Sequence, residues 1–184
     1  SNNALINLLR SGRQEPVDLI FNNIRKKKEL AEIVSKQIEA DSSNIISLLN
    51  DEKYLSQYHF NPKTVPAMFI PNTYEFYWNT SAREFIERMY KEYQRFWDEE
   101  KRNKAHEIGL SPIEVTTLAS IIEEETTKGE EMPKIAGVYI NRLEKGMRLQ
   151  ADPTIKFVIR DFYVNRILDK YVVNDSPYNT YKYA

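Results

Sequence analysis

Two Ser-x-x-Glu sequences, each followed by apolar residues at helical spacing, constrain the fold of this chain most strongly. Ser81 and Glu84 form the first, and Ser111 and Glu114 form the second, with Pro112 between them. In this pattern the serine caps the first helical turn and the glutamate binds back to the serine backbone, so it marks the start of a helix. The fold must therefore contain helices that begin at these two serines.

The helix that follows Ser81 carries a long apolar stripe. Such a stripe is expected to face a hydrophobic core. We predict that the helix runs on toward Gly109, because glycine suits the residue that ends a helix. The stripe consists of Phe85, Ile86, Met89, Tyr93, Phe96 and Trp97.

Shorter segments complete an α+β pattern. Residues 17–21 are predicted to form a β-strand, and residues 67–78 a β-segment with a break at Pro71 and Asn72. Apolar residues recur at helical spacing in 26–43 and again in 43–51. No internal repeat and no low-complexity linker is found, so we predict one helix-rich α+β domain with a small sheet.

Composition excludes several classes of function. The 184 residues carry a net charge of -1, so no long-range attraction to DNA, RNA or an anionic membrane is expected. The basic cluster at 25–28 is consistent with an anion site, but we favour a solvated helix face. Cysteine is absent, and the two histidines, His59 and His106, lack metal-ligand spacing. We therefore predict no nucleic-acid partner, no metal and no cofactor.

Three consecutive glutamates follow the apolar residues of the helix that begins at Ser111, and they are not equivalent. Glu125 continues the apolar face, whereas Glu124 points to the opposite side and Glu123 lies at the edge. A carboxyl group on an apolar face has a raised pKa, as a general acid needs near neutral pH. If the helix ends at Glu123, Glu125 is only a solvated charge, and helical phase leaves both interpretations open. The apolar face consists of Val115, Leu118, Ala119 and Ile122.

Polar and aromatic residues follow in three further blocks. A helix is predicted over 130–146, and it returns Asn141 and Arg142 toward the preceding helix. Residues 147–154 are predicted to be an extended strand or loop that projects polar side chains to one side. Amides, hydroxyls and aromatic faces bind carbohydrate, although each of these residues also has a purely structural interpretation. The polar side chains of the last two blocks are Gln150, Asp152, Thr154, Tyr178, Asn179, Thr180 and Tyr181.

Several blocks of this sequence resemble those of the endolytic murein transglycosylases, the YceG-like family. LASIIEEET, IAGVYINRL, GMRLQADPT and SPYNTY occur in the order and spacing of that family, and FIPNTYEFYW resembles a further block. LINLLRSG resembles the end of the LysM-like module that precedes the catalytic domain. The resemblance implies that residues 1–13 end a LysM-like module and that residues 14–184 belong to an α+β catalytic domain.

The resemblance also implies an activity. Family members cleave the β-1,4 bond between N-acetylmuramic acid and N-acetylglucosamine within peptidoglycan strands, which leaves 1,6-anhydromuramyl ends and terminates glycan elongation. Their catalytic glutamate precedes a threonine in an E-x-E-T block, which is Glu125 here, and one acid acts without a metal or cofactor. Residues implied to bind substrate or support the site are Glu123, Thr126, Asn141, Gln150, Asp152, Tyr178, Asn179 and Tyr181.

Its implied setting is the cell wall. The family is anchored in the bacterial inner membrane by an N-terminal helix, with the catalytic domain facing the periplasm or cell wall beside peptidoglycan synthases. That helix, most of the LysM-like module and a Gly-Pro-rich block after YNTY are absent from the sequence, so we expect it to be a piece of a longer protein.

Two alternatives remain open. One is a peptidoglycan-binding module without activity, in which Glu125 is structural. The other is a helix-turn-helix in residues 111–145, which the net charge and the scarcity of base-reading side chains disfavour.

Overall fold

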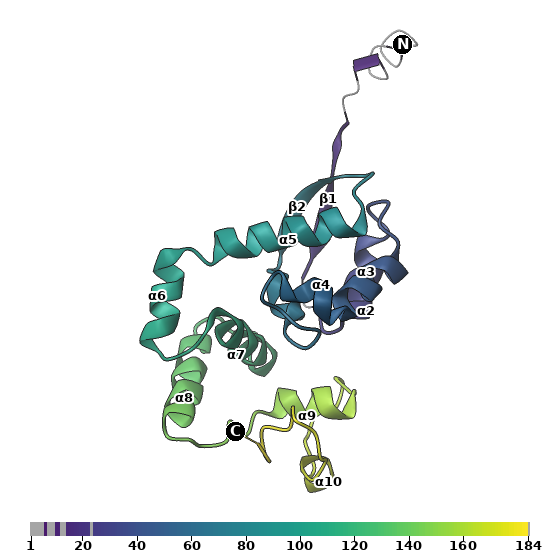
Figure 1. The fold of residues 1–184 in the computed structure, drawn as a ribbon. Coiled ribbons are helices and arrows are strands. Elements are labelled where there is room, and N and C mark those ends of the chain that lie inside the picture. The colour runs from purple at the N-terminus through teal and green to yellow at the C-terminus, as the bar shows by residue number, and fades with distance from the viewer. Residues whose placement is uncertain (1–5, 7–9, 12–13, 23, 184) are drawn as a thin grey trace. The chain divides into compact units, whose positions relative to one another are not determined.

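A computed structural model describes residues 6, 10–11, 14–22 and 24–183 of the chain (Figure 1). The fold is α+β and 53% helical, with a small two-stranded antiparallel sheet, which confirms the predicted class. The chain divides into two compact units, Ser1–Asp98 (unit 1) and Glu99–Ala184 (unit 2), where the sequence predicted a single one. Most of 1–13 lies outside the described residues, so the LysM-like remnant stays a prediction.

In unit 1, helices pack against a small sheet. Strand β1 (Pro16–Phe21) pairs with β2 (Asn72–Tyr77), and Leu19 lies opposite Tyr74. Alternation along the strands buries one face of the sheet, where the Phe76 ring lies 5.6 Å from that of Phe85 on α5. The helices of this unit are α2 (Lys27–Val34), α3 (Ser42–Asn50), α4 (Glu52–Ser56), the 3-10 helix η1 (Val65–Met68) and α5 (Ala82–Phe96). The first predicted strand is confirmed, and the second begins at Asn72, a residue of the predicted break.

Helix α5 begins as its sequence predicts and ends earlier. Both halves of the capping box are present, since Ser81 N donates to Glu84 at 2.8 Å and Glu84 N donates back to Ser81 Oγ at 3.4 Å. Helical backbone stops at Trp97, and α6 (Glu99–Glu107) follows as a separate helix that Gly109 ends with a φ of 70°. The predicted run to Gly109 is therefore wrong, because α6 is so rich in charge that it has little apolar surface to extend the stripe.

Lys27 links two parts of unit 1. Its ammonium group donates to Leu49 O at 3.1 Å, Asn50 Oδ1 at 2.5 Å and Pro62 O at 3.0 Å. These contacts supply a donor at the C-terminal end of α3, where carbonyl groups lack helical partners. Burial lowers the pKa of Lys27. This member of the basic cluster is therefore a structural residue rather than part of an anion site.

We expect Lys27→Met to lower the free energy of unfolding of unit 1 by about 2 kcal/mol, because its acceptors lose a charged donor. Both tryptophans, Trp78 and Trp97, lie in unit 1, so urea unfolding followed by tryptophan fluorescence reports on this unit. The matched control is Lys28→Met, which removes only an exposed ion pair with Glu32 at 3.7 Å and should have little effect. Equal losses in the two variants would contradict the structural role of Lys27.

Unit 2 is a group of helices and a C-terminal segment. Its described helices after α6 are α7 (Pro112–Glu125), α8 (Met132–Glu144), α9 (Asp152–Ile159) and α10 (Asp169–Val172). Leu118 and Ile122 of α7 form a hydrophobic cluster with Tyr139 of α8 and with Ala151. None of the helices that the structure describes is long and apolar enough to cross a membrane.

The start of α9 corrects one prediction. Residues 147–154 are not extended throughout, because α9 begins at Asp152 with Pro153 as its second residue. An acidic side chain and a proline both suit the first turn of a helix. The Asp-Pro pair thus marks a helix start, and it places Asp152 at the N-terminal end of α9.

Candidate active site

Helix α7 carries Glu125 as its last residue. The helix begins at a second capping box, with Ser111 N donating to Glu114 at 2.7 Å, and continues unbroken through Glu125. Leu118 and Ile122 are buried as predicted, but Ala119 is exposed and Val115 is half-buried. Glu125 is also exposed as a whole residue, so its predicted place on a buried stripe is wrong. The cluster under α7 ends one turn earlier.

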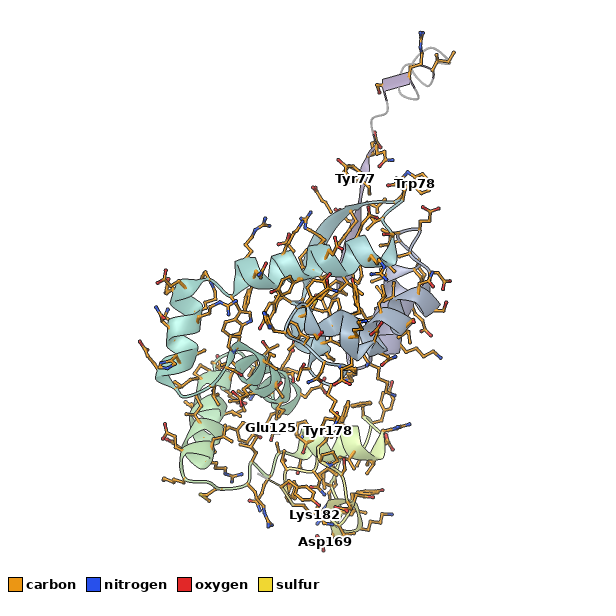
Figure 2. The ribbon with its side chains drawn as sticks, viewed as in Figure 1. Tyr77, Trp78, Glu125, Asp169, Tyr178 and Lys182 are labelled. Atoms are coloured by element: carbon orange, nitrogen blue, oxygen red, sulfur yellow. The ribbon has the colours of Figure 1, made fainter. Side chains whose placement is uncertain are left out.

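The surroundings of the Glu125 carboxyl group nevertheless raise its pKa above the ordinary value. Partial burial of the carboxyl group is the largest cause, and the negative charge of Asp152 adds to it. The positive charge of Lys156 and a hydrogen bond with Tyr139 act in the opposite direction. Glu125, labelled in Figure 2, therefore keeps its proton to a higher pH than an ordinary glutamate does.

Tyr139 is a site residue that the sequence analysis missed. Its side chain is only 5% exposed and belongs to the hydrophobic cluster, while its hydroxyl group is hydrogen-bonded to Glu125. Burial, followed by the charge of Glu125, raises the pKa of Tyr139 to about 12, so the hydroxyl group stays a donor. A tyrosine on an apolar helix face needs a partner for its hydroxyl group, and that was the available signal.

Asp152 and Tyr181 form a second hydrogen-bonded pair in unit 2. The Tyr181 hydroxyl group donates to Asp152 Oδ1. Burial and this bond raise the pKa of Tyr181 to about 12. Asp152 is the first residue of α9, where the helix dipole favours a negative charge. The structure thus brings together two predicted site residues that are 29 positions apart.

Backbone contacts join the C-terminal segment to the start of α9. Gln150 N donates to Thr180 O at 3.0 Å, and Ala151 N donates to Thr180 Oγ1, also at 3.0 Å. The hydroxyl groups of Thr154 and Thr180 are 2.8 Å apart. Gln150 is itself exposed, with a φ of 53°. These contacts place Tyr181 beside Asp152.

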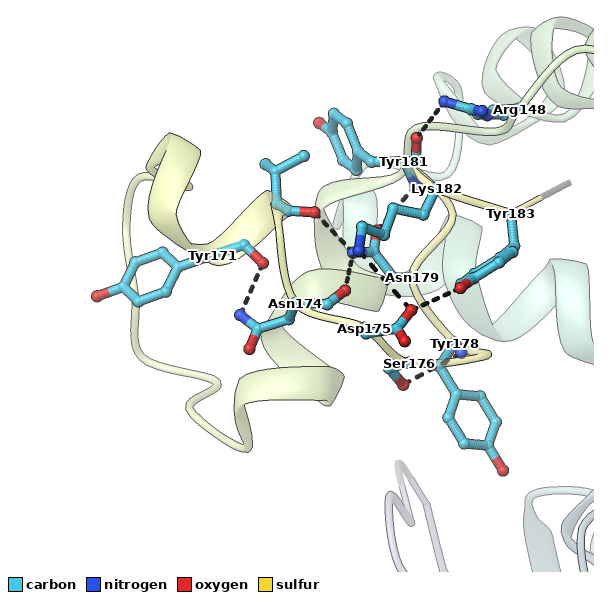
Figure 3. Close-up of polar contacts among 11 residues, drawn as sticks. Arg148, Tyr171, Asn174, Asp175, Ser176, Tyr178, Asn179, Tyr181, Lys182 and Tyr183 are labelled. Carbon is cyan, nitrogen blue, oxygen red and sulfur yellow. Dashed lines mark hydrogen bonds and ion pairs between the residues drawn. The ribbon is translucent and has the colours of Figure 1, made fainter.

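Asn179 braces the C-terminal segment and does not line a groove. It is fully buried, and its amide nitrogen donates to Val172 O at 2.8 Å and to Asn174 O at 2.7 Å. Its side-chain oxygen accepts a hydrogen bond from Tyr181 N at 3.0 Å. Figure 3 shows this side chain surrounded by backbone groups of the segment. Asn179 therefore fixes the backbone that carries Tyr181.

The other predicted residues lie elsewhere in unit 2. Thr126 donates to Glu131 at 2.9 Å, so its hydroxyl group fixes the loop after α7 instead of contacting Glu125. Tyr178 is 48% exposed, and its ring lies 5.2 Å from that of Phe157. Glu123 and Asn141 are exposed on α7 and α8. Among the described residues, no group of three or more potential metal ligands occurs.

Comparisons with known proteins identify the family of this chain. The sequence profile of the YceG-like family matches residues 1–184. A Bacillus subtilis protein named endolytic murein transglycosylase is 32% identical over 173 residues, which cover 84% of this chain and 46% of that protein. A Streptococcus pneumoniae protein of the same name is 39% identical over 77 residues, covering 40% of this chain and 14% of that protein.

A solved structure shares the fold. The crystal structure of a YceG-like protein from Listeria monocytogenes superposes with a TM-score of 0.72 at 25% identity, covering 99% of this chain and 65% of that chain. This chain spans about half, or less, of the length of the curated relatives that it matches. The family profile covers every residue of the sequence, and the chain therefore belongs to the YceG-like family.

Proposed function

We propose that this chain is the catalytic part of a lytic transglycosylase that cuts peptidoglycan strands internally, with Glu125 as the catalytic acid. The observation that carries the proposal is the raised pKa of Glu125 at the exposed end of α7, where an extended polymer can reach it. Two relatives named endolytic murein transglycosylase support the reaction class.

One carboxyl group suffices for this reaction. Protonated Glu125 donates its proton to the glycosidic oxygen while the bond from that oxygen to C1 of N-acetylmuramic acid breaks, and positive charge develops at C1. The resulting Glu125 carboxylate then takes the proton from the C6 hydroxyl group as its oxygen bonds to C1. The products are a new N-acetylglucosamine end and a 1,6-anhydromuramyl end, and Glu125 is protonated again.

The setting of the reaction is part of the same proposal. The whole protein would be anchored in the inner membrane by a segment outside this sequence, with unit 2 facing the cell wall. There it would cut nascent strands made by peptidoglycan synthases and so terminate their elongation. Substrate contacts would come from exposed groups of unit 2, such as Tyr178 and Asn141.

Mass spectrometry of the products tests the proposal. Uncrosslinked glycan strands are incubated with the parent chain, with Glu125→Gln and with the matched control Glu124→Gln. We expect internal fragments with 1,6-anhydromuramyl ends from the parent and the control, and none from Glu125→Gln. Reducing ends would show hydrolysis and overturn the reaction class. Binding of strands without cleavage by any of the three proteins would favour a peptidoglycan-binding module, for which the exposed Phe157–Tyr178 pair is suited.

A further inference from the structure

The Glu125 carboxyl group lies among charged and titratable side chains from three elements. Tyr139 approaches from α8, Asp152 and Lys156 belong to α9, and Tyr181 comes from the C-terminal segment. The positive charge of Arg142, also on α8, lowers the pKa of Tyr139 and so opposes the effect of burial. Only Glu125 has an assigned task in the proposed reaction, so the roles of Tyr139 and Asp152 remain to be explained.

We propose that Tyr139 positions the Glu125 carboxyl group for proton transfer, and that Asp152, itself held by Tyr181, is a second carboxylate of the site that acts on Glu125. This inference rests on the proposed function.

Tyr139 is suited to orient a carboxyl group. Its ring is fixed in the cluster with Leu118 and Ile122, so its hydroxyl group has a defined position relative to the end of α7. The hydroxyl group donates to the Glu125 carboxyl group, which has two oxygens and so can hold this bond and the transferable proton at once. Proton transfer is efficient only when the acid is held within hydrogen-bond reach of the group that it protonates. Tyr139 supplies that restraint.

Asp152 is placed to hold a negative charge near Glu125. It lies at the N-terminal end of α9, has Lys156 one turn later, and accepts the Tyr181 hydrogen bond. Tyr181 donates to Oδ1 of Asp152, which holds this carboxylate in place. The negative charge of Asp152 favours the protonated form of Glu125.

The two residues act on Glu125 with opposite signs, which provides a sharp test. Asp152→Asn removes a negative charge, so the pKa of Glu125 should fall. Tyr139→Phe removes a donor to the carboxylate but keeps the buried ring, so the pKa of Glu125 should rise. Tyr178→Phe is the matched control, because it removes an exposed tyrosine hydroxyl group and keeps the ring beside Phe157, and it should leave the pKa of Glu125 unchanged.

The pKa can be measured directly by NMR titration of the chain labelled with 13C at the glutamate side-chain carboxyl position. The Glu125 signal is identified as the one that Glu125→Gln removes. This readout needs no cleavage, so a chain that fails to cut glycan still tests the inference. If Asp152→Asn disturbs the start of α9, Asp152→Ser removes the charge and keeps a residue that favours helix starts.

Cleavage kinetics provide the second readout. Activity that requires protonated Glu125 falls as the pH rises through its pKa, so this fall should move to lower pH in Asp152→Asn and to higher pH in Tyr139→Phe. Tyr139→Phe should also lower kcat with little change in KM, because it disturbs the acid rather than substrate binding. Shifts of the same sign, or no shift in correctly folded variants, would overturn the inference.

Discussion

Glu125→Gln is expected to reduce cleavage of glycan strands by at least about 100-fold, the lower end of what a positioned general acid contributes. Glutamine keeps the size of the side chain and can still contact Tyr139, but it has no proton of suitable acidity to donate. The rate of anhydromuramyl end formation measures the effect. Glu124→Gln, one position earlier on α7, should retain the parent rate. Comparable losses in both variants would show that the helix end, not one carboxyl group, matters.

The same substitution should not destabilise the fold. The raised pKa of Glu125 means that its protonated form contributes stability below the ordinary pKa of about 4.5, and that this contribution is lost as the pH rises through the raised pKa. Glu125→Gln removes the titration, so the variant should melt at the same temperature as the parent or a few degrees higher at neutral pH. Thermal melts at several pH values measure this. A variant that is inactive and less stable would instead indicate a structural role for Glu125.

Asn179→Ala is expected to cause the largest loss of stability in unit 2, about 3 kcal/mol. The fully buried amide serves three backbone groups, and each buried group left without a partner costs about 1–3 kcal/mol. Both tryptophans lie in unit 1, so unfolding of unit 2 should be followed by hydrogen exchange of its backbone amides. Faster exchange across the segment after α10, where Tyr181 lies, is the expected result.

Asn174→Ala is the matched control for that experiment. Asn174 is exposed, and its side chain donates one local hydrogen bond to Tyr171 O at 2.8 Å. Its loss should therefore change exchange by little. Because Asn179 holds the backbone that carries Tyr181, Asn179→Ala should also weaken the Tyr181 contact with Asp152. If both asparagine variants exchange alike, Asn179 is not the brace that its contacts indicate.

Helix starts were the most predictable features of the fold. The capping boxes at Ser81 and Ser111 are present as predicted, and the first strand is also confirmed. The end of α5 at Phe96 was not predicted, since Phe96 and Trp97 continue the apolar spacing. The apolar spacing continues to Trp97, but the residues that follow are the charged ones of α6, which form a separate helix. Periodicity therefore indicated most of the α5 residues that face the core, but not how far the helix extends, and Phe96 is exposed.

The candidate site, like the fold, was predictable only where it depends on local sequence. Helical phase distinguished Glu125 from Glu123 and Glu124, because phase depends only on neighbours along one helix. Phase also suggested that Glu125 is buried, and this was wrong, because burial depends on what other elements cover. The partner of Glu125 proved to be Tyr139, a residue that reads as part of an apolar stripe.

By itself, the sequence determined where α5, α7 and the first strand begin, which of the three glutamates is distinct, and the family to which the chain belongs. These properties reside in local hydrogen bonds, in helical period and in the order of short blocks. Only the tertiary structure decided that Tyr139 contacts Glu125, that Tyr181 bonds to Asp152 across 29 positions, and that Asn179 is a brace. Such contacts follow no period, because they depend on how α7, α8, α9 and the C-terminal segment pack in space.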